Sequence, residues 1–124
     1  MNNKDQSLIE GKESIISELG YWPEFCDAKV IQLEYFAYTD SGAKLSVVLH
    51  YIDMDMNRDL CVKFTFHGVF EMDFQDFKAE NVIDKLSISN FYIVYIEAAT
   101  GLSGYCKCKA IDVNILSSKQ YLVD

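Results

Sequence analysis

Residues 44–66 read KLSVVLHYIDMDMNRDLCVKFTF, and the alternation inside this stretch decides the fold. In each half, apolar side chains recur at every second position, which is the period of a β-strand with one buried face. The polar segment between the halves is expected to be a solvated hairpin tip. The side chains expected on the buried face are Leu45, Val47, Leu49 and Tyr51 in the first strand and Leu60, Val62, Phe64 and Phe66 in the second.

Period-two patterns continue on both sides of this hairpin. KVIQLEYFAY at 29–38 predicts a strand with alternating faces, and VFEMDF continues the pattern after Gly68, where a change of face predicts a bulge or bend. Further strands are expected at 90–98 and 104–116, the second bending near 110–111, where its apolar side changes. The side chains expected to share one face of the 29–38 strand are Ile31, Leu33, Tyr35 and Ala37.

A short helix precedes the strands. Apolar residues at 15, 16 and 19 fall near one helical face, and Gly20 stands where a helix C′ residue belongs, with Pro23 shortly after it. These features predict a helix over about 12–19. Residues 76–87 allow two interpretations, namely one or two helical turns, or an irregular connection buried through Phe77, Val82, Ile83 and Leu86.

Together these elements predict a mainly β (α+β) fold. We expect an antiparallel sheet or sandwich of about six strands with a short N-terminal helix, because no βαβ alternation occurs. The length of 124 residues suits a single domain at 1–124, and the polar residues 1–6 are expected to form a disordered tail.

The net charge and the N-terminal sequence indicate which partners and which cellular compartment to expect. The net charge is −8, from 19 acidic and 11 basic residues, so nucleic acid is disfavoured and a basic protein partner is favoured. No apolar run approaches the roughly 18 residues of a membrane span. The start, MNNKDQSLIEGKES, has no signal-peptide pattern, so we expect a cytoplasmic protein with four reduced cysteines and no membrane partner.

The residues capable of catalysis form no convincing set. A small metal- or ligand-dependent enzyme would need Cys26, Asp27, His50 and His67 in one pocket. The acids beside Cys26 disfavour its thiolate, and a strand would hold the side chains of Cys106 and Cys108 about 7 Å apart, too far for one zinc ion. We therefore expect no enzyme, no metal and no cofactor, and we interpret the cysteines as small buried side chains.

Acidic residues are concentrated between 53 and 76, a stretch that contains six acidic and two basic residues. If the hairpin tip and the strand after Gly68 lie close together, these acids form one patch that a partner can recognise, with Tyr51 as an aromatic anchor. A solvated face that protects sheet edges is the alternative. The acids are Asp53, Asp55, Asp59, Glu71, Asp73 and Asp76.

A family resemblance is carried mainly by GYWPEFCDAKV at 20–30. This stretch resembles the W-P-x-F-H-D-A-x-V/I segment that leads into the first strand of the bacterial immunity protein 50 family. The likeness continues through Phe66–Val69 (F-x-G-V), 76–83 and 104–108, and spans about 12–116. The residues that carry the first motif are Gly20, Trp22, Pro23, Phe25, Cys26 and Asp27.

The resemblance implies an immunity protein of a polymorphic toxin system. Such a protein is cytoplasmic, is not an enzyme, and binds and blocks one cognate toxin domain. If that toxin is a basic nuclease, the acidic residues would mimic phosphates. Cys26 stands where the family pattern has His, which implies a structural position. Open alternatives are a non-toxin interaction module and, for the oligomeric state, a monomer or a homodimer.

Overall fold

The computed structural model describes residues 9–122, so the tail predicted at 1–6 lies outside the described residues. The fold class is mainly β with one short helix, as predicted, and the described strands number nine rather than about six. In chain order the elements are β1 (Ile9–Glu10), α2 (Lys12–Leu19), β2 (Lys29–Thr39), β3 (Gly42–Asp53), β4 (Arg58–Val69), β5 (Glu71–Gln75), β6 (Val82–Ile88), β7 (Ile93–Thr100), β8 (Ser103–Lys107) and β9 (Ala110–Lys119).

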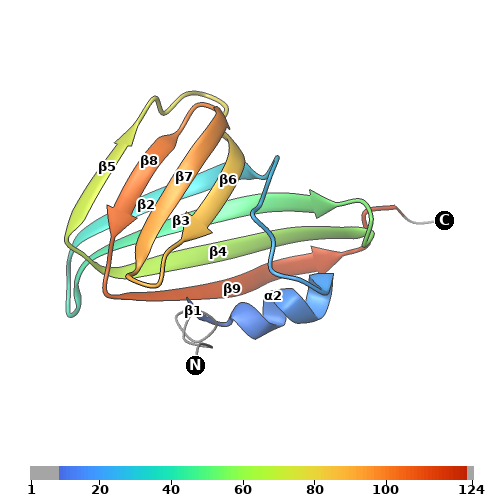
Figure 1. The fold of residues 1–124 in the computed structure, drawn as a ribbon, viewed down its shortest axis with the longest axis horizontal. Helices are drawn as coiled ribbons and strands as arrows, with labels where there is room; N and C mark the ends of the chain where they lie inside the picture. The colour runs from blue at the N-terminus through green and yellow to red at the C-terminus, as the bar shows by residue number, and fades with distance from the viewer. Residues whose placement is uncertain (1–8, 123–124) are drawn as a thin grey trace.

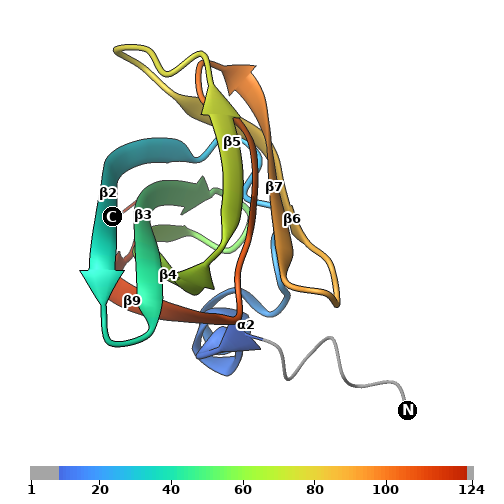
Figure 2. The same ribbon diagram turned by 90° about the vertical axis from the view of Figure 1, so that its left-hand side faces the viewer.

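The strands form one sheet that folds over itself into two layers. The sheet order is β1-β9-β4-β3-β2-β6-β7-β8-β5, and every pairing except the parallel β1–β9 contact is antiparallel. In Figure 1 the shorter strands β5, β8, β7 and β6 lie in front and run steeply across the long strands β2, β3, β4 and β9. Figure 2 shows the two layers from the side, facing each other.

The β3–β4 hairpin has the faces that its alternation predicts. All of the side chains predicted to be buried are 9% exposed or less, because they point into the core between the layers. They meet across the two strands, with Leu45 opposite Phe66 and Leu49 opposite Val62. Antiparallel pairing of these two faces therefore builds the base of the core. On the other face of the same strands Ser46, Val48 and Thr65 are also buried, at 2%, 4% and 8% exposed.

The chain passes between the layers at two neighbouring corners. At the first, after β4, the Phe70 N–H donates to the Lys107 carbonyl oxygen at 3.0 Å. At the second, between β8 and β9, the Lys109 N–H donates to the His67 carbonyl oxygen at 2.8 Å. Gly68 has a φ of 64°, a left-handed conformation that glycine adopts without strain. The bend predicted at Gly68 is confirmed, and the last predicted strand is two strands in different layers.

The helix packs beside β9 at the edge of the rear layer (Figure 1). Ile15 and Leu19 are 0% and 1% exposed and belong to the core, so the helix spans the predicted residues 12–19. Gly20 follows with a φ of 85°, and its N–H donates to the Ile16 carbonyl oxygen at 2.7 Å. The described residues include no helix that is long and apolar enough to cross a membrane.

Residues 20–30 run from the helix into β2 and join the two layers. The Asp27 N–H donates to the Ile83 carbonyl oxygen at 2.7 Å, and the Ile83 N–H donates to the Ala28 carbonyl oxygen at 2.8 Å. These bonds attach the segment to β6 in the front layer. Phe25, fully buried, fills the core between the layers.

Two sequence expectations differ from the structure. Within the stretch 76–87, residues 76–81 are irregular, whereas 82–87 belong to strand β6, which neither interpretation predicted. Phe77 is 61% exposed rather than buried. The connection is held instead by Asn81, whose Oδ1 accepts from the Lys78 N–H at 3.0 Å and the Leu102 N–H at 2.9 Å. In β2, a bulge between Val30 and Gln32 interrupts the alternation, so Ile31 lies outside the predicted buried face and is 55% exposed.

Candidate interaction surface

The four residues of the enzyme alternative do not converge. On the outer face of the rear layer, the Nε2 of His50 lies 2.8 Å from the Asp59 Oδ1, and the Nε2 of His67 lies 2.7 Å from the Asp112 Oδ2. His50 pairs with Cys61, and the six-residue step from that position to His67 spans roughly 20 Å of extended strand. The two histidines therefore cannot share one substrate or metal ion.

Asp27 and His50 do line a common hollow of about 310 Å³, together with Lys29, Ile52, Met54 and Tyr121. The sequence of the turn into β2 would allow the Asp27 carboxylate to accept from nearby backbone N–H groups. In the structure Asp27 has a φ of 70°, and no such bond occurs within residues 9–122. Nor is any group of three or more His, Cys, Asp or Glu side chains in this range placed to hold a metal ion.

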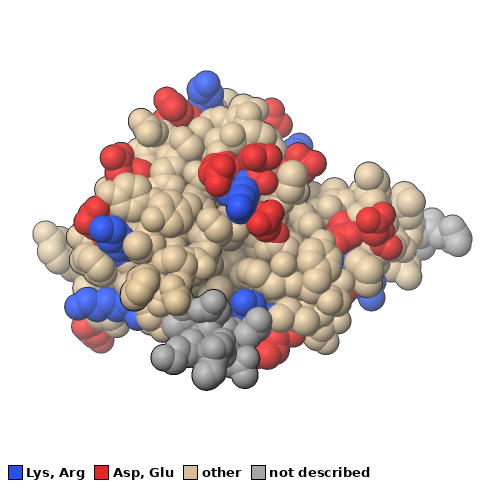
Figure 3. Space-filling view, in the orientation of Figure 1, with Lys and Arg blue, Asp and Glu red and all other residues tan. Residues whose placement is uncertain are grey.

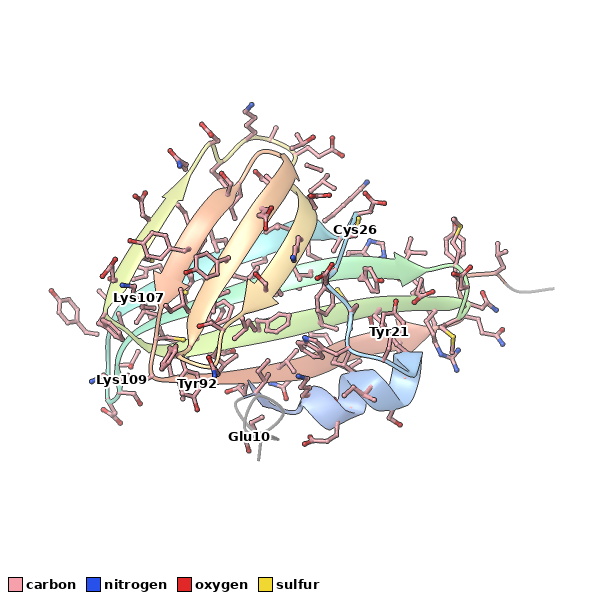
Figure 4. All side chains as sticks on the ribbon, in the orientation of Figure 1. Glu10, Tyr21, Cys26, Tyr92, Lys107 and Lys109 are labelled. Atoms are coloured by element: carbon pink, nitrogen blue, oxygen red, sulfur yellow. The ribbon has the colours of Figure 1, made fainter. Side chains whose placement is uncertain are left out.

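Cys26 lies on the surface of the segment between the helix and β2 (Figure 4). Partial desolvation raises the pKa of its thiol, and the carboxylates of Asp27, Asp84 and Glu24 raise that pKa further. The thiol is therefore protonated at neutral pH and is a poor nucleophile. The interpretation of the cysteines as buried small side chains is correct for Cys106 and Cys108 and wrong for Cys26, while Cys61 is half-buried.

The acids of the 53–76 stretch fall into two groups instead of one patch. Asp53, Asp55 and Asp59 lie at the tip of the β3–β4 hairpin, whereas the others lie on or just after β5 in the opposite layer. The ten residue steps from Asp59 to Val69 span roughly 33 Å of extended strand. Figure 3 accordingly shows acidic side chains in several separate groups, one of them over the hairpin end at the right.

At the hairpin end, two tyrosines and an aspartate brace one another. The Tyr21 hydroxyl donates to the Asp53 Oδ2 and lies 3.0 Å from the Tyr51 hydroxyl. The Met56 N–H donates to the Asp53 Oδ1 at 3.0 Å. Burial and the bond to Asp53 raise the pKa of Tyr21, so the hydroxyl remains a donor at neutral pH. Tyr51 itself is 9% exposed, and its ring packs against Phe25 at 5.2 Å, so the ring is a core group.

Around this brace lies an open hollow of about 510 Å³. Its apolar rim is exposed, with Met54 at 70% and Met56 at 47% exposure, and Tyr21 at 41%. The lining contains two carboxylates and no basic side chain. We call the lining residues the hairpin-end surface: Tyr21, Tyr51, Ile52, Asp53, Met54, Asp55 and Met56.

This surface has the chemistry of a protein-binding site. Exposed methionines adapt their shape to an apolar partner, and carboxylates beside them suit a basic group. Of the partner contacts predicted from the sequence, Asp53, Asp55 and Tyr51 lie on this surface, whereas Tyr21 and the methionines were not among them. The signal for the methionines was present in the DMDM run at the hairpin tip, where apolar side chains have no core to enter. Tyr21 reaches the hairpin from 30 residues away, which no local pattern indicates.

Comparison with known proteins adds one finding. A sequence model of the family described as Immunity protein 50 matches residues 11–118. The match includes the junction at 20–30, every strand from β2 to β8 and nearly all of β9. No curated protein and no solved structure matches the chain.

Proposed function

Because this chain belongs to the immunity protein 50 family, we propose that it binds one cognate bacterial toxin domain and blocks it by covering its functional surface. The protein acts by occlusion, without a catalytic step and without a cofactor. It does so in the cytoplasm of the cell that makes the toxin. The observation that best supports this proposal is the hairpin-end surface, which is exposed, apolar at its rim and braced beneath.

Bracing matters because binding costs less when the contact surface is already ordered. The bonds from Tyr21 and Met56 to Asp53 hold the hairpin tip in one arrangement. The tip is also held by Asn57, whose Oδ1 accepts from the Leu122 N–H at 2.7 Å and whose Nδ2 donates to the Leu122 carbonyl oxygen at 3.1 Å. Less conformational freedom is then lost when the toxin docks.

Electrostatic attraction supplies the second part of the proposal. A net charge of −8 attracts a basic toxin such as a nuclease, and the exposed Asp55 places a carboxylate at the contact. The proposed steering acids are those of both groups: Asp53, Asp55, Asp59, Glu71, Asp73 and Asp76. Such charges raise the association rate more than the affinity, and salt weakens their effect.

The test is binding and protection with the toxin encoded by the adjacent gene. The wild-type protein should co-purify with that toxin and restore growth of cells that express it. The double variant Met54→Ser/Met56→Ser should raise the Kd about tenfold or more, because it removes the apolar rim. Phe91→Ser, which removes a 77% exposed side chain from the β6–β7 turn, is the matched control and should bind normally. Absence of both binding and protection by the wild type would refute the proposal.

Cys26→Ser is expected to leave both toxin binding and stability nearly unchanged. Its thiol is exposed and protonated, so serine alters neither the core nor the charge. Surface changes of this kind shift free energies by about 0.5 kcal/mol or less, which is about twofold in Kd. Titration calorimetry with the toxin measures the effect, and a loss of binding in the folded variant would assign Cys26 a direct role.

A further inference from the structure

The two layers diverge along the side where β2 faces β5, and an open cleft lies between them. The cleft has a volume of about 430 Å³. Five of its lining residues carry large apolar side chains, contributed by both layers. Figure 2 looks toward this side of the molecule, with β2 in one layer and β5 in the other. The lining residues are Leu33, Tyr35, Leu45, Met72, Asp73 and Phe74.

Two of the lining side chains belong to the core face yet remain exposed. Tyr35 pairs with Leu45, which is 2% exposed, and Met72 pairs with Cys106, which is 0% exposed. Residues directly opposite in a sheet share a face, so Tyr35 and Met72 point toward the interior. They are nevertheless 53% and 39% exposed. The cleft is thus an unfilled continuation of the hydrophobic core.

Both strands that border the cleft also have a free edge. β2 pairs with β6 only at Lys29 and Val82, so within the described chain Gln32–Thr39 have no strand partner on that side. β5 pairs with β8 alone and is the last strand in the sheet order. Unpaired backbone groups beside an apolar cleft are the arrangement that accepts an added strand.

The charged residues around the cleft indicate which kind of extended segment from a partner can bind there. Asp73 borders the cleft on β5, but it pairs with Tyr105 and alternates with Met72 and Phe74, so its side chain lies on the outer face of that strand, beside the free edge. Within residues 9–122 its carboxylate has no ion pair. The neighbouring acid Glu71 is already held by the Tyr105 hydroxyl and by the Lys107 Nζ at 3.5 Å. Lys44 is occupied on the other face of β2, where its Nζ lies 4.7 Å from the Phe36 ring centroid. Side chains alternate along an extended segment, so a segment that turns an apolar residue into the cleft presents the neighbouring residue outward, where a basic side chain can meet the carboxylate of Asp73.

We propose that this cleft receives an extended segment of the cognate toxin, which pairs with the free edge of β2, seats an apolar side chain among Tyr35, Met72 and Phe74, and places a lysine or arginine beside Asp73. The proposal rests on the proposed function for the identity of the partner. It makes the contact bivalent: the hairpin-end surface and the cleft lie toward opposite ends of β3, so the segment adds a second attachment to the folded toxin domain. A second copy of this chain fits less well, because each copy carries a charge of −8.

The test compares cleft variants with the wild type in toxin binding and in binding of peptides that tile the toxin sequence. Tyr35→Lys and Met72→Lys place a charge in the cleft and should each weaken toxin binding about tenfold. Asp73→Asn should weaken it by less and reduce its salt dependence. One basic, apolar peptide should bind the wild type but not Tyr35→Lys, and should slow amide hydrogen exchange within Gln32–Thr39. Phe91→Lys is the matched control, and circular dichroism verifies that all variants are folded.

Each result has one meaning. Toxin binding by the wild type that is unchanged in both Tyr35→Lys and Met72→Lys overturns the cleft assignment and leaves the proposed function intact. Failure of the wild type to bind the toxin overturns both. A wild-type dimer that Tyr35→Lys dissociates, with no toxin peptide bound, shows that a second copy occupies the cleft and overturns the assignment to the toxin.

Discussion

Phe25→Ala is expected to lower the free energy of unfolding by about 3–5 kcal/mol, as large-to-small changes of buried aromatic residues do. Phe25 is 0% exposed and stands where the helix-to-β2 segment crosses between the layers. Its ring meets three others edge-on, with centroids 5.2 Å from Tyr51, 5.5 Å from Phe64 and 5.8 Å from Trp22. Alanine leaves a cavity bordered by both layers, which neither layer can fill without moving the other.

The backbone of Phe25 makes the ring more important. Its φ is 59°, an uncommon conformation for a bulky residue, and burial of the ring holds it there. Alanine keeps a Cβ in that conformation but removes the contacts that maintain it. Urea denaturation measures the change, with Phe91→Ala as the control, since a 77% exposed ring should cost less than about 0.5 kcal/mol. A cost near that of the control would mean that the ring does not join the layers.

The same residue explains how far the sequence predicts this fold. The alternation at 44–66 correctly predicts which side chains of β3 and β4 enter the core between the layers, although Ser46 and Val48 on the other face are buried as well. Residues 20–30 are equally decisive for the structure, yet they have no period. Phe25 is positioned by its neighbours Asp27 and Ala28, whose backbones bond to Ile83 in β6, far away in sequence. The family motif marks this junction only through resemblance.

The candidate surface was less predictable than the fold. Asp53 and Asp73 are close in sequence, which predicts a single acidic patch. The long strand β4 lies between them in the chain, however, so they stand toward opposite ends of the molecule. The cleft was also not predicted. Alternation correctly assigns Leu33 and Tyr35 to the inner face of β2, but whether an inner face is covered depends on the angle between the layers. That angle follows from the corners near Gly68 and Lys109, which are set by contacts between distant segments.

Gly104→Ala is expected to destabilise the protein by about 2–5 kcal/mol, from the cost of a left-handed backbone and of overpacking against a neighbouring strand. Gly104 has a φ of 144° and pairs with Phe74 in the β5–β8 ladder. A Cβ on Gly104 would lie 2.0 Å from the Asp73 carbonyl oxygen and 2.8 Å from the Phe74 Cα. Both atoms are backbone, so β5 must move away from β8, and relief by a side-chain rotation is not available.

Gly42→Ala separates the cost of a left-handed backbone from the cost of overpacking. Gly42 also has a positive φ, 95°, but a Cβ there would meet only the Gly68 Cα at 3.8 Å, an ordinary contact. It should therefore cost about 1–2 kcal/mol, which is the backbone term alone. Urea denaturation of both variants gives the difference, and equal costs would show that β5 yields easily. Because β5 forms one wall of the cleft, a folded Gly104→Ala protein should also lose affinity for the toxin peptide while the hairpin-end surface still binds the toxin domain. Loss of both contacts in the folded variant would mean that the cleft and the hairpin end are not independent attachments.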